Sequence, residues 1–115
     1  MKNTVSLKLN RDFRNLYRRG KSSVSPYLAL YARKTKNAGN RVGITVSTKV
    51  GHAVVRNRVR RRIREAYRLN EELFLSGLDV VIVARVRARD ASFAEIEKSL
   101  CSLARGLGIL REVQE

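Results

Sequence analysis

Arginine side chains that could bind phosphate are concentrated in one stretch of the chain, residues 49–68. A guanidinium group is planar and carries five N–H donors, so it can grip a phosphate with two bonds and stack on a base. Glu65 is the only acid in this stretch, so we expect its arginines to lack partners within their own helix. The candidate phosphate-binding residues are Lys49, Arg56, Asn57, Arg58, Arg60, Arg61, Arg62, Arg64 and Arg68.

The charge of the whole chain decides how this stretch is interpreted. A charged helix face is often simply solvated. This chain, however, has 25 Lys and Arg against 10 Asp and Glu, which gives a formal net charge of +15 over 115 residues. Repulsion among so many positive charges destabilises the folded state, and such an excess is typical of proteins with a polyanionic partner. Nucleic acid is the first candidate and an anionic membrane surface the second. Charge alone does not separate DNA, ribosomal RNA and other structured RNA.

Side chains for catalysis or metal binding are scarce. The chain has one histidine and one cysteine. We predict that His52 is an exposed loop residue and that Cys101 is a small residue of the core. No metal-ligand spacing is present, so we predict no catalytic residue and no metal site in this chain. The acids that could be considered fall on different predicted elements: Asp12, Glu65, Asp79 and Asp90.

Targeting signals are also missing from the sequence. It contains no run of about 18 apolar residues and no apolar segment behind Met1, so we expect neither a membrane span nor a signal peptide. A single cysteine fits a reducing compartment. The expected location is the cytoplasm, without a membrane partner.

Two helical patterns position the candidate residues. In residues 53–69, Val55, Val59, Ile63 and Ala66 share one narrow face that should pack on a sheet, leaving the arginines on the other sides. An earlier helix should follow an N-cap at Asn10 and end near Gly20, with one apolar face made by Phe13, Leu16 and Tyr17.

Strand patterns lie between and after these helices. In residues 27–32, Leu28 alternates with the aromatic pair Tyr27 and Tyr31, which should share the other face. A turn at 36–40 leads to a second alternating run, 41–47, so we predict an antiparallel hairpin. We predict that residues 21–26 form a polar connection between the first helix and the first strand. Residues 78–84 are nearly all aliphatic, as in a strand buried on both faces.

The last element is a helix that begins with a capping box, Ser92 and Glu95. The predicted order is therefore α-β-β-α-β-α, and the fold class is α+β: a two-layer α/β sandwich in a single domain, 1–115.

The stretch 49–65 resembles the signature of the bacterial ribonuclease P protein component. It reads Lys-x-Gly-x-Ala-Val-x-Arg-Asn-Arg-Val-x-Arg-Arg-Ile-Arg-Glu. Phe-x-x-Leu-Tyr-x-x-Gly at 13–20 resembles the first helix of that family, and 41–47 and 79–84 resemble two of its strands. The resemblance covers roughly residues 13–107, in the family's order.

This resemblance implies a function and a fold. The protein would join a large catalytic RNA, and the holoenzyme, a ribonucleoprotein endonuclease, would hydrolyse the 5′ leader from precursor tRNA. Catalysis would belong to the RNA and to Mg²⁺ that the RNA mainly holds. No obligate protein partner is implied. The implied fold is that of domain IV of elongation factor G, with an unusual left-handed βαβ crossover, against the usual rule.

The resemblance also assigns roles to residues. The arginine-rich helix and Lys49 would bind the catalytic RNA. The 5′ leader would lie in a cleft between the sheet and the first helix, where aromatic side chains can stack on unpaired bases. Phe13 fits the core as well as it fits the cleft. The candidate leader-binding residues are Phe13, Tyr17, Tyr27 and Tyr31.

Overall fold

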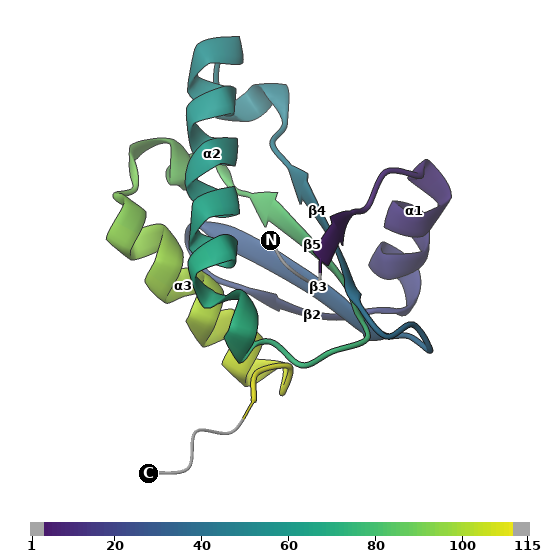
Figure 1. Cartoon of the computed structure of the whole chain (residues 1–115). Helices are drawn as coiled ribbons and strands as arrows, with labels where there is room; N and C mark the ends of the chain where they lie inside the picture. Colours follow the sequence, from purple (N-terminus) through teal and green to yellow (C-terminus); the bar gives the residue numbers. More distant parts are fainter. Residues whose placement is uncertain (1–3, 112–115) are drawn as a thin grey trace, which may run out of the picture.

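The chain forms one five-stranded sheet with helices on both faces (Figure 1). The structure is a computed structural model that describes residues 4–111. Its strands and helices are, in chain order, β1 (Thr4–Ser6), α1 (Asn10–Arg19), β2 (Lys21–Val24), β3 (Leu28–Lys34), β4 (Asn40–Thr45), α2 (Ala53–Asn70), β5 (Leu78–Ala84) and α3 (Phe93–Gly106). Three 3₁₀ turns join them: η1 (Thr48–Val50), η2 (Glu71–Leu73) and η3 (Val86–Asp90).

The strand order β1-β4-β5-β3-β2 shows that the predicted hairpin is wrong. β3 and β4 do not pair with each other, because β5 lies between them, antiparallel to β3 and parallel to β4. Ile82 at the centre of β5 is opposite Leu30 on one side and Ile44 on the other. The aliphatic strand takes the middle because only there are both of its edges paired and both of its faces covered.

Two strands were missing from the predicted order. β2 lies within the segment interpreted as a polar connection, and β1 is a three-residue strand parallel to β4. Both are edge strands, mostly exposed and short, so they lack the apolar alternation that marks a half-buried strand. The predicted α+β class and the order of the other six elements are confirmed.

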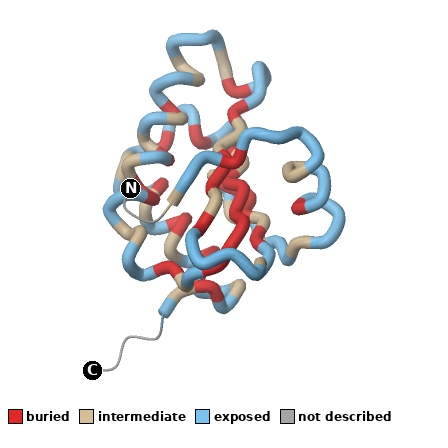
Figure 2. Tube along the Cα trace, turned by 45° about the vertical axis from the view of Figure 1, so that its right-hand side comes forward, coloured by how far each residue is buried: buried red, intermediate tan, exposed pale blue. Residues whose placement is uncertain are grey.

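The two faces of the sheet are packed differently. α2 and α3 cover one face, and most of the core lies there, including Leu30, Ile63, Ile82 and Leu100. Figure 2 shows the buried residues concentrated along the strands and the inner sides of the helices. α1 covers part of the opposite face through a smaller cluster built on Leu7, Leu16 and Val81. The rest of that second face is therefore available for a partner.

The predicted N-terminal cap is confirmed for α3 but not for α1. α3 has the predicted capping box, in which Ser92 Oγ accepts from the Glu95 backbone N–H and the Glu95 carboxylate accepts from the Ser92 N–H. The hydrogen bond from the Ser92 backbone N–H to this carboxylate, followed by the one from the Tyr27 hydroxyl, holds the pKa of Glu95 below its usual value. α1 instead begins at Asn10, with Leu9 as N-cap and no side-chain capping bond, so the predicted N-cap is wrong by one residue.

β4, α2 and β5 form a crossover between two neighbouring parallel strands. Its left-handedness and the likeness to domain IV of elongation factor G stay predictions. The domain boundaries 1–115 also stay a prediction, because residues 1–3 and 112–115 lie outside the described part of the chain.

Candidate nucleic-acid interface

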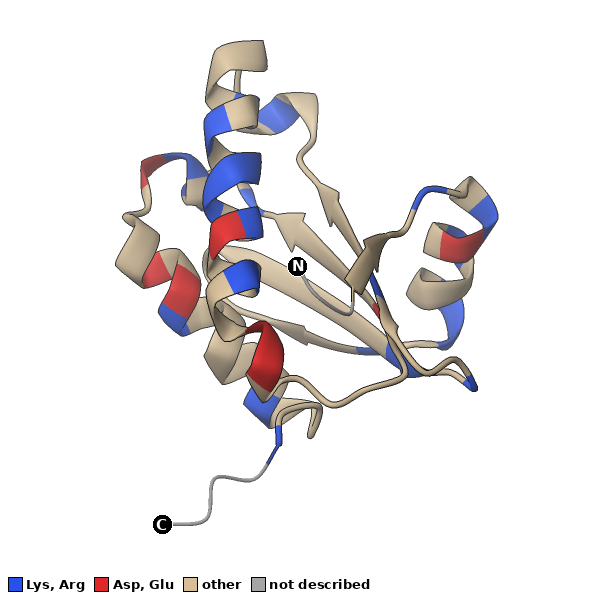
Figure 3. Cartoon of the chain, in the orientation of Figure 1, with Lys and Arg blue, Asp and Glu red and all other residues tan. Residues whose placement is uncertain are grey.

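α2 places most of its arginines in solvent because its apolar residues repeat at helical spacing. Val59, Ile63 and Ala66 are completely buried against the sheet, as predicted, and Tyr67 joins them. Val55 is only half-buried but packs on the same core. We define the arginine face as the arginines of α2 other than Arg62: Arg56, Arg58, Arg60, Arg61, Arg64 and Arg68. Figure 3 shows blue Arg bands recurring along α2, with tan residues and a red acid between them.

The start of α2 is fixed by Gly51. Its φ of +155° and ψ of −170° belong to a region that is essentially restricted to glycine. A Cβ there would also lie 3.0 Å from Val55 Cγ1. Val50, just before it, is completely buried and anchors η1, so Lys49 stands on a well-fixed turn at the entrance to the helix.

Not every arginine of α2 is free for a ligand. Arg62 donates from Nη1 to the Ala91 carbonyl oxygen at 2.8 Å and so ties α2 to the segment before α3. Arg68 forms an ion pair with Glu65, whose pKa is lowered by the hydrogen bond from this guanidinium. Arg60 donates from Nη1 to the exposed Asn57 Oδ1 at 3.1 Å, so the expectation that the arginines lack partners within the helix is wrong for Arg60 and Arg68. Glu65 lies three residues before Arg68, on the same side of the helix.

Arg56 has a different environment. Its Nε is buried and has no hydrogen-bond partner among the described residues. A buried donor without a partner costs on the order of 1–3 kcal/mol, and native structures contain few of them.

Arg60 and Arg64 reach toward the other half of the interface. They line a hollow of about 180 Å³ together with Phe13 of α1 and Gly43 and Ile44 of β4. The hollow lies beside the part of β4 that extends beyond its pairing with β1, which ends at Val42. The arginine face and the first helix, far apart in sequence, therefore meet at this edge of the sheet.

Three of the four predicted aromatic residues gather on the α1 side of the sheet. The Tyr17 and Tyr31 rings meet edge to face, with centroids 4.9 Å apart. Tyr17 is 42% exposed, whereas Phe13 and Tyr31 are half-buried over Leu16 and Val81. We call Phe13, Tyr17 and Tyr31 the aromatic cluster. The exposed edge of the cluster could stack on nucleotide bases, while its inner side packs on the smaller core. Phe13 therefore belongs both to the core and to the cleft.

Tyr27 does not belong to this cluster. It precedes β3 and packs on the α2 and α3 side, where its hydroxyl donates to Glu95 Oε2 at 2.5 Å. This hydrogen bond raises the pKa of the Tyr27 phenol. The prediction that Tyr27 and Tyr31 share a face is wrong because strand alternation begins only at Leu28.

α1 is held against the sheet by Arg41. This side chain donates to both oxygens of Asp79 on β5, at 2.8 and 2.6 Å, and to Asp12 on α1 at 3.2 Å. The sequence placed these two acids on different elements and gave no reason to pair them. The structure brings them together, but each is already bound to a guanidinium.

Gly43 lets the Phe13 ring lie directly on β4. A Cβ at this position would be 2.6 Å from Phe13 Cζ, so the Gly43→Ala variant is expected to displace the ring and with it α1. Overpacking of this kind costs typically 1–3 kcal/mol in the free energy of unfolding. Urea unfolding measures it. Gly106→Ala is the matched control, because a Cβ there meets nothing within 4 Å. Equal stability of the two variants would mean that Phe13 does not pack on Gly43.

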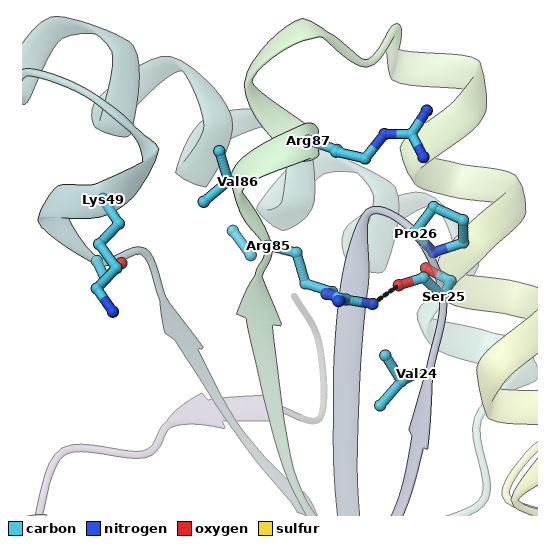
Figure 4. Close-up of a pocket in the computed structure, with 9 residues that line it drawn as sticks. Val24, Ser25, Pro26, Lys49, Arg85, Val86 and Arg87 are labelled. Atoms are coloured by element: carbon cyan, nitrogen blue, oxygen red, sulfur yellow. Dashed lines mark hydrogen bonds between the residues drawn. The ribbon is translucent and has the colours of Figure 1, made fainter.

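A second hollow, of about 700 Å³, lies where β5 ends and β3 begins (Figure 4). We call it the strand-end hollow; Val24, Pro26 and Val86 give it an apolar wall. Arg85 donates from Nη1 to the Ser25 carbonyl oxygen at 2.8 Å, and Lys49 stands on the opposite side. Arg87 also lines the hollow, but its guanidinium extends toward α3 and lies 6.0 Å from the Tyr27 ring.

Sequence reasoning missed Arg85. The available signal was the alternation of cations directly after the buried strand, at 85, 87 and 89.

For metal binding, residues 4–111 contain no group of three or more His, Cys, Asp or Glu side chains placed to hold an ion. His52 is the exposed N-cap residue of α2 and makes no side-chain capping bond. Within the same residues, no helix is long and apolar enough to cross a membrane.

Known proteins resemble this chain over nearly all of its length. The family described as Ribonuclease P matches residues 1–108. The ribonuclease P protein component of Clostridioides difficile (strain 630) is 50% identical over 103 residues, covering 89% of this chain and 90% of that protein. That of Alkaliphilus metalliredigens (strain QYMF) is 39% identical over 110 residues, covering 96% and 99%.

Solved structures show the same relationship. The RNase P protein of Staphylococcus aureus superposes with a TM-score of 0.84 at 31% identity, covering 92% of this chain and 97% of that one. The protein from Thermotoga maritima gives a TM-score of 0.79 at 31% identity, covering 87% and 96%.

Proposed function

Because this chain belongs to the ribonuclease P protein family, we propose that it binds two RNAs at once: the catalytic RNA and the 5′ leader of precursor tRNA. Membership makes it a protein subunit of ribonuclease P, a nuclease complex of tRNA processing.

The arginine face is the proposed surface for the catalytic RNA. Its exposed guanidinium groups repel one another until a polyanion neutralises them, so part of the binding energy comes from relief of that repulsion. Lys49 stands at the start of the same helix. Arg62 and Arg68 can take part with the donors that their contacts to Ala91 and Glu65 leave unused.

The aromatic cluster and the strand-end hollow are the proposed path of the leader. Tyr17 offers an exposed ring for stacking, and Arg85 offers a cation for the backbone beyond it. The observation that carries the proposal is the hollow shared by Arg60, Arg64 and Phe13. Since it joins the arginine face to the aromatic cluster, an RNA held on one is adjacent to an RNA held on the other.

Cleavage itself is proposed to belong to the RNA, with Mg²⁺ held mainly by that RNA. Asp12 and Asp79 are both bound to Arg41, which disfavours them as a general acid–base pair. In this proposal the protein positions the leader and neutralises charge, and no side chain of the chain is catalytic. The cytoplasmic location expected from the sequence stays a prediction.

Reconstitution tests the proposal. The chain is mixed with a bacterial ribonuclease P RNA at low Mg²⁺, where phosphate repulsion is least screened. We expect faster cleavage of precursor tRNA and tighter binding of precursor than of mature tRNA. A chain that only binds structured RNA would bind both tRNAs equally and would not raise the cleavage rate, and either result would overturn the proposal.

A further inference from the structure

A third group of cations lies at the end of β3 that is opposite to the strand-end hollow. Arg19 at the end of α1, Lys21 in β2, and Arg33 and Lys34 at the end of β3 surround a hollow of about 270 Å³. All four are exposed. We call them the β3-end patch. Figure 3 shows Lys and Arg at the end of β3 and at the neighbouring end of α1.

Acidic side chains of residues 4–111 do not neutralise these cations. In the described part of the chain none of the four forms an ion pair, and no acid lines the hollow. The nearest acids along the adjoining surface, Asp12 and Asp79, are both held by Arg41. Three separate elements thus bring positive charges together without compensation, which is unfavourable unless an anion binds there.

The position of the patch makes it a separate site. The strand-end hollow lies at the start of β3, and the patch lies at its end. A strand rises about 3.3 Å per residue, so the seven residues of Leu28–Lys34 separate the two sites by roughly 20 Å. A single nucleotide cannot span this distance, so the patch needs a nucleotide other than one bound in the strand-end hollow.

The lining residues indicate which part of an RNA would bind. The hollow's other residues are Ala32, Leu107 and Ile109, and none is aromatic. Lys and Arg only donate hydrogen bonds, and the phosphate oxygens only accept them. Without a ring for stacking or an acceptor to read base edges, the surface suits the backbone rather than the bases.

We propose that the β3-end patch binds the phosphate backbone of a second RNA segment, independently of base sequence. This rests on the proposed function, because it takes the RNAs of that function as the available polyanions. The segment belongs either to the catalytic RNA or to the precursor tRNA outside the leader path.

The test replaces two cations of the patch in the full-length chain, Arg33→Gln with Lys34→Gln. The matched control is Lys98→Gln with Arg105→Gln, which removes one lysine and one arginine from exposed positions of α3. Each double variant is titrated against salt in two assays: binding to ribonuclease P RNA alone, and binding of precursor tRNA to the preformed holoenzyme. Urea unfolding verifies that both variants fold.

We expect the patch variant to lower the slope of log affinity against log salt by about one to two units in one of the assays, with the control unchanged. A change in the first assay assigns the segment to the catalytic RNA, and a change only in the second assigns it to the precursor tRNA. Equal slopes for patch variant, control and wild type overturn the inference. The proposed function fails separately, if the wild-type chain itself does not stimulate cleavage.

Discussion

Replacing Arg60 and Arg64 together by alanine is expected to weaken binding to ribonuclease P RNA and to make that binding less sensitive to salt. Each lost phosphate contact should lower the slope of log affinity against log salt by about one unit. A hydrogen bond to a charged group contributes roughly 1.5–3 kcal/mol, so affinity should fall by at least about tenfold per arginine. Filter binding at several salt concentrations measures both quantities.

The hollow that these two arginines share with Phe13 adds a second consequence. If they also hold RNA next to the aromatic cluster, the double variant should lose part of its preference for precursor over mature tRNA. The control is Lys98→Ala with Arg105→Ala on the exposed side of α3, which removes the same charge. A variant that behaves like this control would show that Arg60 and Arg64 do not contact RNA.

Tyr17→Ala is expected to reduce the preference of the holoenzyme for precursor tRNA over mature tRNA. Tyr17 is the exposed ring of the aromatic cluster, and loss of one base–aromatic stack costs about 1–3 kcal/mol. The preference should therefore fall by roughly 5- to 150-fold, while affinity for ribonuclease P RNA alone stays close to that of the wild type. Tyr31→Ala should act in the same direction but also lower stability, because Tyr31 packs on the small core beneath α1.

Tyr27→Ala distinguishes the structure from the sequence pattern. The pattern put Tyr27 beside Tyr31, but its hydroxyl is bound to Glu95 on the other side of the sheet. This variant should keep the wild-type preference for precursor tRNA. A loss as large as that of Tyr17→Ala would mean that the leader passes over Tyr27 instead of the aromatic cluster.

The arginine-rich helix was predictable because its signal is local. Val59, Ile63 and Ala66 recur at helical spacing, and burying them leaves the intervening arginines outside. β5 was predictable because its aliphatic run has no exposed face, and α3 because its capping box is confined to four residues. The resemblance to the ribonuclease P protein family rests on the same local stretch.

Strand pairing was not predictable in this way. A turn between two alternating runs favours a hairpin. The local pattern does not reveal that a third, more apolar strand occupies the position between them. The same limit applies to Tyr27, since the residue at which strand alternation begins is set by pairing with β5 and not by the sequence of β3.

The sequence by itself determined which groups are available: an excess of positive charge, one amphipathic helix with arginines on its outer sides, and aromatic residues for stacking. Only the tertiary structure decided which of them meet. It brought Arg60 and Arg64 to Phe13, tied Asp12 and Asp79 to Arg41, and separated the β3-end patch from the arginine face. The physical reason is that periodicity fixes the side of an element on which a residue lies, whereas contacts between elements depend on how a buried strand and two layers of helices fill one core.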